Sequence, residues 1–272
     1  MLLTIDIGNT QTSFGVFERQ NAPEGLVATW RVSTHAQATP DELAVQMIAL
    51  LATHGLALAD IEAVCLGSVV PKLSRAWIRA CADRALPVPL LPSEIAPHDL
   101  GLTSGQCAMV GADRLANVVA ARARYGAPAI VVDFGTATNL DVIDAAGHFI
   151  GGPISAGLEL SAAALYAQAA RLTAIELAAP TRIIAQTTED ALRAGLVVGE
   201  AAKVDGLVTR IADELGGAAP AQLTAGKLPV IATGGLADLI APHSRTITVI
   251  APTLTLEGLY VLAHDALQGT QA

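Results

Sequence analysis

Leu2-Leu3-Thr4-Ile5-Asp6-Ile7-Gly8-Asn9-Thr10 is the stretch that decides the fold, because the middle of the chain repeats its pattern. The second copy reads Ile130-Val131-Val132-Asp133-Phe134-Gly135-Thr136-Ala137-Thr138. Each copy is a short apolar strand that runs into Asp, a spacer, Gly and small residues. Glycine permits a tight turn with close ligand approach, and successive N–H groups in such a turn can bind anionic oxygens. Either turn alone could be an ordinary hairpin, but the pair predicts two loops that grip a nucleotide polyphosphate from both sides.

The elements expected in each half, beginning with the strand of each copy, follow one order: three strands, a helix, a strand, a helix and a strand. Apolar periodicity and turn residues predict strands at 2–8, 12–18, 26–32, 61–67 and 88–91 in the first half, with helices after Thr39 and at 71–85. Thr39, Pro40 and Glu42 give the first of these helices a capping box. In the second half, strands are expected at 129–134, 139–143, 148–151, 229–233 and 246–250, and helices at 157–170, 188–215 and 256–267.

This repeated order resembles the actin-like ATPase (ASKHA) fold. That α/β fold has two ribonuclease-H-like lobes with mixed five-stranded sheets and a cleft between them. The expected lobes are 1–110 and 111–272, and the second includes a connecting helix at 111–125.

The composition limits the partners. The chain has 272 residues, is 52% hydrophobic and carries a net charge of −9, which argues against nucleic acid and anionic membrane surfaces. Only Lys72, Lys203 and Lys227 are lysines, so a phosphorylated ligand must be neutralised by backbone donors, arginines and bound cations. No signal peptide is evident, and no apolar run reaches the roughly 18 residues of a membrane helix. Three widely spaced cysteines fit neither a disulfide framework nor a zinc site, so we expect a cytoplasmic protein.

Gly111-Ala112-Asp113-Arg114 opens a predicted helix and contains the best candidate for a general base. Asp113 could merely favour the helix dipole. The alternative is that Asp113 accepts the proton of an attacking hydroxyl while Arg114 binds a substrate carboxylate. Thr233-Gly234-Gly235, at a strand-to-helix turn, could be structural or could let an adenine or ribose approach the backbone. Gly151-Gly152-Pro153 could lie near a substrate or at a subunit contact.

Taken together, these motifs resemble type III pantothenate kinase, the family also described as Bvg accessory factor. The resemblance covers essentially the whole chain and also includes Gly67-Ser68-Val69-Val70-Pro71, Gly151-Gly152-Pro153-Ile154, Ala232-Thr233-Gly234-Gly235-Leu236-Ala237 and Leu254-Thr255-Leu256-Glu257-Gly258-Leu259. It implies ATP-dependent phosphorylation of pantothenate to 4′-phosphopantothenate, the first step towards coenzyme A. It also implies a homodimer with substrate sites at the subunit interface.

The resemblance assigns roles to individual residues. Asp113 is the proton acceptor, and Asp133 binds a monovalent cation, K⁺ or NH₄⁺. Asp6 is expected near the Mg²⁺ that accompanies ATP. The residues implied to bind ATP are Asp6, Ile7, Gly8, Asn9, Thr10, Gln11, Thr12, Ser13 and Thr136. Those implied to bind pantothenate are Gly111, Ala112, Asp113, Arg114 and Thr188.

The chain departs from the family pattern mainly on the acceptor side. Ser104-Gly105-Gln106-Cys107-Ala108-Met109 stands where the family usually has a Tyr and an Asn-Pro, and Ala185-Gln186-Thr187-Thr188 replaces a usual Gly-Lys-Asn-Thr. Asn139 replaces a usual Thr, and Ser155-Ala156-Gly157 a usual Ala-Pro-Gly. Two alternatives therefore stay open: a non-catalytic nucleotide-binding regulator of the same fold, and a kinase of another small alcohol such as a sugar.

Overall fold

The computed structural model describes residues 1–19, 25–96, 100–169, 172–216 and 228–269. Packing divides the chain into two compact units, one comprising Met1–Ala120 and Thr253–Ala272, the other Ala121–Pro252. These units do not coincide with the ranges 1–110 and 111–272 expected for the lobes. The difference arises because the C-terminal helix α11 (Leu254–Gly269) packs on strands at the start of the chain, a contact between segments too distant in sequence to be read from local patterns.

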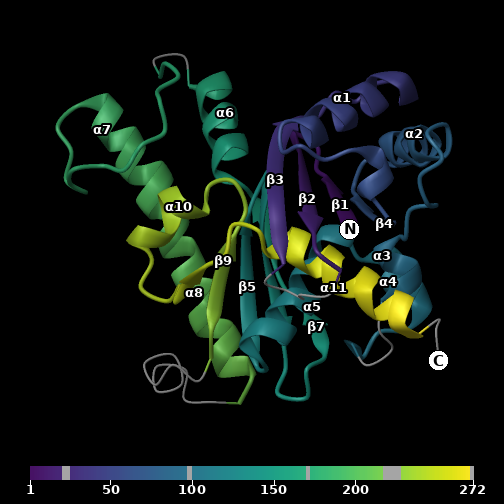
Figure 1. The fold of residues 1–272 in the computed structure, drawn as a ribbon. Coiled ribbons are helices and arrows are strands. Elements are labelled where there is room, and N and C mark those ends of the chain that lie inside the picture. The colour runs from purple at the N-terminus through teal and green to yellow at the C-terminus, as the bar shows by residue number, and fades with distance from the viewer. Residues whose placement is uncertain (20–24, 97–99, 170–171, 217–227, 270–272) are drawn as a thin grey trace. The chain divides into compact units, whose positions relative to one another are not determined.

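The first unit is built on a four-stranded sheet in the order β3-β2-β1-β4. The strands are β1 (Leu2–Ile7), β2 (Gln11–Phe17), β3 (Leu26–Ser33) and β4 (Ala63–Ser68). β1 is antiparallel to β2 and parallel to β4. Helices α1 (Pro40–Ala52) and α2 (Pro71–Ala82) lie on one face of this sheet, and α11 lies on the other (Figure 1).

Alternation along the strands explains how the first sheet packs on both faces. Leu3, Ile5 and Ile7 belong to the core beneath α1 and α2, whereas Leu2 belongs to the core beneath α11, as expected from side chains that alternate between faces. α1 begins as predicted, since Thr39 and Glu42 form the capping box and Pro40 is the first helical residue.

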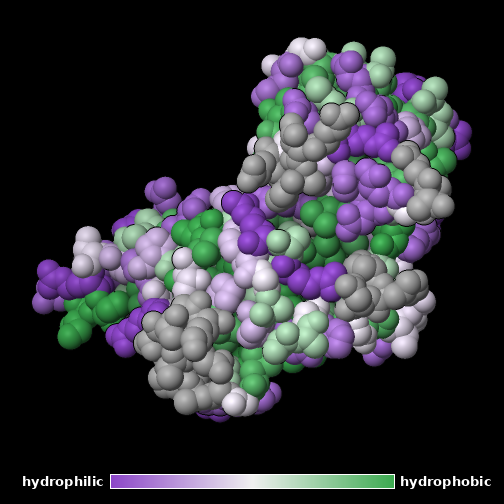
Figure 2. All heavy atoms as spheres, turned by 60° about the horizontal axis from the view of Figure 1, so that its bottom comes forward, coloured by the Kyte–Doolittle hydropathy of each residue, from purple (hydrophilic) through white to green (hydrophobic). Residues whose placement is uncertain are grey.

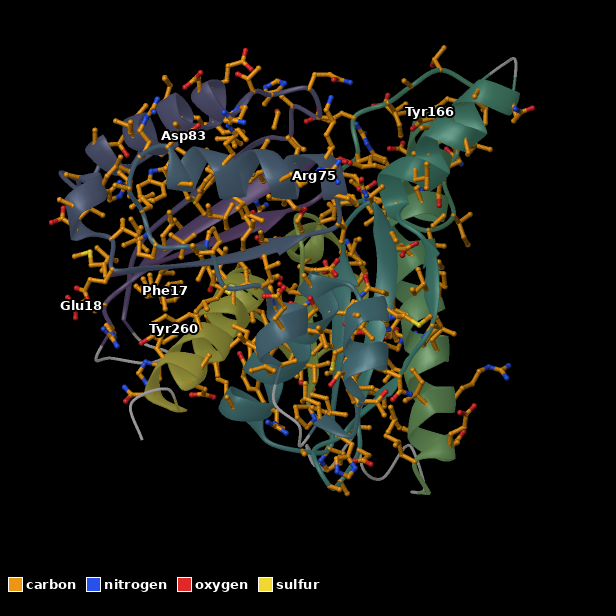
Figure 3. All side chains as sticks on the ribbon, turned by 90° about the vertical axis from the view of Figure 1, so that its right-hand side faces the viewer. Phe17, Glu18, Arg75, Asp83, Tyr166 and Tyr260 are labelled. Atoms are coloured by element: carbon orange, nitrogen blue, oxygen red, sulfur yellow. The ribbon has the colours of Figure 1, made fainter. Side chains whose placement is uncertain are left out.

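An aromatic pair fastens α11 to the end of β2. The rings of Phe17 and Tyr260 stack with centroids 4.7 Å apart. The Tyr260 hydroxyl donates to the carbonyl oxygens of Glu18 and Arg19 at 3.1 and 3.2 Å. Figure 3 shows Tyr260 beside Phe17 at this end of the strand. These contacts explain why the C-terminal helix belongs to the first unit.

The second unit is built on a six-stranded sheet in the order β10-β9-β5-β6-β7, with β8 also paired to β6. Its strands are β5 (Ala129–Phe134), β6 (Ala137–Ile143), β7 (Phe149–Gly151), β8 (Ile154–Ala156), β9 (Val230–Thr233) and β10 (Val249–Ile250). Its helices are α6 (Leu158–Gln168), α7 (Thr188–Arg193), a π-helical turn (Ala194–Val198), α8 (Gly199–Glu214) and α10 (Ala237–Ile240). Val204 and Val208 of α8 pack in one core with Ile130 and Val132 of β5.

The predicted internal repeat is confirmed by the two strand orders. β1, β2 and β4 correspond to β5, β6 and β9, since each central strand has one antiparallel and one parallel neighbour. The expectation of five strands in each sheet is wrong. In the described part of the first unit, the strand expected at 88–91 is a single bridge between Cys65 and Leu90, and proline at positions 87, 89 and 92 removes the N–H donors that a longer ladder needs. The second sheet gains β8, whose three residues were too few to signal a strand.

Three further helices follow β4 and α2 in the chain. They are α3 (Pro92–Ile95), α4 (Ser104–Met109) and α5 (Ala112–Tyr125), and α5 continues across the boundary between the units at Ala120. Among the described residues, none of the helices combines the length and apolar character needed to cross a bilayer. Figure 2 shows hydrophilic and hydrophobic residues interspersed on the face it presents.

Candidate active site

The first predicted phosphate turn joins β1 to β2 in the first unit. Asp6 and Ile7 pair with Ser13 and Thr12 in the antiparallel ladder, which leaves residues 8–11 to form the turn. The Gly8 N–H donates to the Gln11 carbonyl oxygen at 2.9 Å and closes the turn. The side chains of Asn9, Thr10 and Gln11 are exposed, while Ile7 and Thr12 are buried. The predicted ATP-binding stretch is thus an exposed polar turn on buried strand ends.

The start of α5, with Gly111-Ala112-Asp113-Arg114, lies at the same sheet edge as Asp6. Gly67 of β4 pairs with Asp6 of β1, and a Cβ at Gly67 would lie 3.5 Å from the Cβ of Ala112. Adjacent strands are about 4.8 Å apart, so Asp6 and the first turn of α5 are near neighbours. The structure therefore brings the candidate base and the first phosphate turn together within one unit.

Gly111 leaves room for the observed position of the Asp113 carboxylate. A side chain at position 111 would overlap the Asp113 Oδ1 atom. The same Oδ1 accepts a hydrogen bond from the backbone N–H of Arg114 at 2.8 Å. Asp113 is half-buried. The carboxylate is thus held in place at the helix start by the adjacent backbone, as a positioned general base needs to be.

The second predicted phosphate turn joins β5 to β6 in the second unit and is one residue shorter than the first, because Phe134 pairs with Thr138. The Gly135 N–H donates to the carbonyl oxygen of Ala137, two residues on, at 3.0 Å, whereas in the first turn the Gly8 N–H donates to that of Gln11, three residues on. The Thr136 side chain is exposed. The Gly157 N–H donates to the Thr136 carbonyl oxygen at 3.0 Å, and a side chain at position 157 would overlap the backbone of this turn. Gly157 therefore packs directly against the backbone of the second turn and holds it by a hydrogen bond.

A buried charge pair that the sequence did not reveal also supports the second turn. The Glu200 carboxylate, in α8, accepts from the Thr138 hydroxyl and from Lys203 Nζ, both at 2.7 Å. Lys203 Nζ also donates to the Ala156 carbonyl oxygen at 3.2 Å. Glu200 is 6% exposed, so this ammonium neutralises a buried carboxylate. Nothing in the sequence distinguishes Glu200 from the other acidic residues of the predicted helix.

Both lysines of the described residues have partners within the protein. Lys203 is paired with Glu200, and Lys72 Nζ donates to Gln37 Oε1. Lys227 lies outside the described residues.

Asp133, the predicted ligand of a monovalent cation, lies against the Thr233-Gly234-Gly235 turn. Asp133 pairs with Thr233 in the parallel ladder. Gly234 has a φ of +91°, and a Cβ there would lie 2.5 Å from Asp133 Oδ1 and 2.6 Å from the Phe134 carbonyl oxygen. The second glycine-rich motif therefore makes room for Asp133.

The chemistry around Asp133 and Asp6 fits hard cations. Carboxylate and carbonyl oxygens are the donors that such ions prefer, and the Asp133 carboxylate and the Phe134 carbonyl oxygen both face the position that a Cβ at Gly234 would take. Within the described ranges, no group of three or more His, Cys, Asp or Glu side chains could hold a metal ion. Magnesium bound through one carboxylate and the phosphates of a substrate needs no such group.

Thr188 is the first residue of α7 and is exposed. Thr187 caps this helix, because its hydroxyl accepts from the Asp190 N–H at 3.1 Å. In the first unit, Gln106 closes a capping box with Thr103 at the start of α4. The residues that depart from the family pattern in these two segments therefore include helix caps.

The remaining motifs have structural explanations. A side chain at Gly152 would overlap the Leu140 carbonyl oxygen, so this glycine allows the chain to cross close to β6.

Cys65, Cys81 and Cys107 are buried free thiols. Burial raises the pKa of Cys65 to about 12 and of Cys81 to about 11, which disfavours the thiolates needed for metal or redox chemistry. A hollow of about 330 Å³ near Thr12 and Ser33 extends towards α1 and α2, within the first unit.

Comparisons with known proteins identify the family. A family profile described as type III pantothenate kinase matches residues 2–210. Type III pantothenate kinase of Rubrobacter xylanophilus is 42% identical over 266 residues, which are 96% of this chain and 97% of the relative. That of Thermomicrobium roseum is 42% identical over 270 residues, with 98% and 99% covered.

Solved structures support the fold. A Baf-family protein of Campylobacter jejuni has a TM-score of 0.59 at 16% identity, with 98% of this chain and 99% of that chain covered. The ADPNP-bound activator of 2-hydroxyisocaproyl-CoA dehydratase from Clostridium difficile has a TM-score of 0.51 at 12% identity, with 99% and 96% covered. At these identities the likeness concerns the fold alone, and it confirms the actin-like ATPase architecture. The near-complete coverage of relatives at 42% identity shows that this chain belongs to the type III pantothenate kinase family.

Proposed function

We propose that this protein transfers the γ-phosphoryl group of ATP to the primary hydroxyl of pantothenate. The observation that carries the proposal is the pair of Asp-x-Gly turns at equivalent places in two topologically related sheets. Phosphoryl transfer depends mainly on positioning and charge stabilisation, which exposed backbone turns and bound cations can supply. Membership of the family, together with the names of its members, supports pantothenate as the acceptor.

The proposed reaction assigns each group a task. The pantothenate hydroxyl oxygen forms a bond to the γ-phosphorus while the bond from that phosphorus to the bridging oxygen of ADP breaks. Asp113 takes the hydroxyl proton, and Arg114 binds the pantothenate carboxylate. Residues 6–13 and Thr136 bind ATP, and Gly111 and Ala112 shape the start of the acceptor site. Bound Mg²⁺ and K⁺ or NH₄⁺ would neutralise phosphate charge, with Asp6 and Asp133 as their protein ligands.

Further assignments rest on the family pattern. We infer that Thr188 contacts pantothenate across a homodimer interface and that the protein acts in the cytoplasm. We also retain 1–110 and 111–272 as the proposed ranges of the two ribonuclease-H-like lobes. Sedimentation at several concentrations tests the dimer directly, because a monomer at micromolar concentration would contradict it.

A panel of alcohol acceptors tests the proposed function. Release of ADP is measured by a coupled assay with pantothenate, a hexose, glycerol and no acceptor, in the presence of MgATP and KCl. We expect ADP release with pantothenate and only background with the others. ADP release with a hexose alone would identify a kinase of another alcohol. ATP binding without consumption under all conditions would identify a regulator, the role suggested by the departures at Gln106 and Gln186.

A further inference from the structure

We infer that Thr34, a residue without an assigned role, positions the first phosphate turn for binding the ATP polyphosphate. Thr34 follows the last residue of β3, Ser33, which pairs with Gln11 at the start of β2. This register places Thr34 beside the turn of residues 8–11. The inference rests on the proposed function, because it concerns how that turn holds its nucleotide.

Thr34 makes three hydrogen bonds to the turn and its base. Its backbone N–H donates to the Thr10 carbonyl oxygen at 2.9 Å. Its hydroxyl donates to the Gly8 carbonyl oxygen at 2.9 Å and also lies 2.9 Å from the Thr12 hydroxyl. One residue therefore fixes both ends of the turn.

The direction of these bonds can be deduced. A hydroxyl group has one proton, and the Thr34 proton is given to the Gly8 carbonyl, which can only accept. The Thr12 hydroxyl must therefore donate to Thr34. Thr12 is 4% exposed, so its hydroxyl depends on protein partners for its hydrogen bonds. The result is a directed chain from Thr12 through Thr34 to Gly8, in which each bond polarises the next.

The bond to Gly8 determines where a neighbouring donor points. In a planar trans peptide, the C=O and the N–H point in opposite directions. When Thr34 draws the Gly8 carbonyl towards itself, the N–H of Asn9 in the same peptide group points away from Thr34. Backbone N–H groups of a turn bind phosphate oxygens when they are oriented together. We therefore assign Thr34 the role of orienting the Asn9 N–H, without contact between Thr34 and the nucleotide.

The test compares Thr34→Val with Thr34→Ser. Valine keeps the β-branched shape and the backbone N–H but removes the hydroxyl, whereas serine keeps the hydroxyl. We expect Thr34→Val to raise the Kd and KM for ATP about tenfold, because the net contribution of one hydrogen bond corresponds to about a factor of ten in affinity. The KM for pantothenate should change less than twofold. Thr34→Ser should restore the ATP affinity to within about threefold of the unaltered protein. Thr29→Val is the matched control, because Thr29 is an exposed threonine of β3, the strand that Thr34 follows, and the ATP affinity of this variant should be unchanged.

The outcomes separate this inference from the proposed function. If the unaltered protein binds ATP and phosphorylates pantothenate but Thr34→Val has normal ATP affinity, the inference alone is overturned. Equal losses in Thr34→Val and Thr34→Ser, or equal effects on both substrates, would also overturn it, because they would indicate a general structural role. If Thr34→Val does not fold, Thr34→Ala replaces it, with the same expected rescue by serine. An unaltered protein that binds no ATP would overturn both proposals.

Discussion

Gly111 and Asp113 illustrate how a residue without a side chain controls one that has a chemical task. The Asp113 carboxylate occupies space that a side chain at position 111 would fill, and the Arg114 N–H holds one of its oxygens. The sequence predicted Asp113 as the base from its place in the motif. It could not predict that Gly111 is needed for the rotamer, because that need depends on the local path of the backbone.

Replacing Asp113 by Asn should remove the proton acceptor while leaving its geometry intact. The amide oxygen can still accept from the Arg114 N–H, so we expect ATP binding to be nearly unchanged. Turnover should fall by about a hundredfold or more, the usual effect of losing a general base. Steady-state kinetics and calorimetric ATP titration measure the two effects. Asp41→Asn, in the first turn of α1, is the matched control, and near-normal turnover in Asp113→Asn would exclude Asp113 from the mechanism.

Replacing Gly234 by Ala should impair the cation site proposed at Asp133. The new Cβ would lie 2.5 Å from Asp133 Oδ1, at a φ of +91°, so the carboxylate or the turn must move. We expect the K⁺ concentration for half-maximal rate to rise several-fold, measured with Na⁺ replacing K⁺ at constant ionic strength. Gly55→Ala is the control, since Gly55 has a φ of +70° but open space around it. The Gly55→Ala variant should lose about 1 kcal/mol of stability and keep the K⁺ response of the unaltered protein. If the rate of the unaltered protein does not depend on K⁺, the cation role of Asp133 is contradicted.

At the scale of elements, the sequence predicted the helix start and the strands that depend only on residues near one another in the chain. The capping box at Thr39 and Glu42 started α1 where expected, and the two Asp-x-Gly strands became β1 and β5. The strand expected at 88–91 failed because its prolines interrupt the ladder. The placement of α11 on the first sheet could not be predicted, because it depends on packing between residues more than 200 positions apart, such as Tyr260 with Glu18.

The crossing of α11 over α5 should be especially sensitive to added volume. A side chain at Gly258 would overlap the backbone of Ala116. We expect Gly258→Ala to destabilise the first unit by about 1–3 kcal/mol, the typical cost of overpacking, and to lower the melting temperature. Gly206→Ala is the matched change, because Gly206 lies inside α8 with open space around it. It should instead stabilise by about 0.5–1 kcal/mol; equal effects in the two variants would contradict the proposed close crossing.

At the scale of the whole molecule, the two units can be followed separately. All three cysteines and both tryptophans, Trp30 and Trp77, lie in the first unit. Thiol labelling and tryptophan fluorescence therefore report on that unit alone, whereas far-ultraviolet circular dichroism reports on both. This distribution makes the buried thiols useful probes of stability and of ligand binding.

The thiols should also make stability depend on alkaline pH. Burial raises the pKa of Cys65 from an ordinary value of 9.0 to about 12. Below pH 9 both folded and unfolded states keep the proton, so the thiol's contribution to stability is fully present. As the pH rises from 9 towards 12, only the unfolded state releases the proton, and the free energy of unfolding falls. Fluorescence-monitored denaturation should show this loss, and Cys65→Ala should reduce it; an unchanged slope in Cys65→Ala would contradict the assignment.

ATP should protect the Cys65 thiol although it does not contact it. In a Cys81→Ala, Cys107→Ala background at pH 8, labelling of Cys65 requires transient opening of the first unit, because the native thiol is buried and protonated. A ligand that binds only the closed state at about 100 times its Kd adds about 2.7 kcal/mol, which corresponds to roughly a hundredfold slower labelling when reclosing is fast. AMP is the control, since it lacks the β- and γ-phosphates of the polyphosphate that the turn at Gly8 is proposed to hold, and it should protect far less at the same concentration. Saturating ATP without any slowing of labelling would mean that the first turn does not hold the nucleotide.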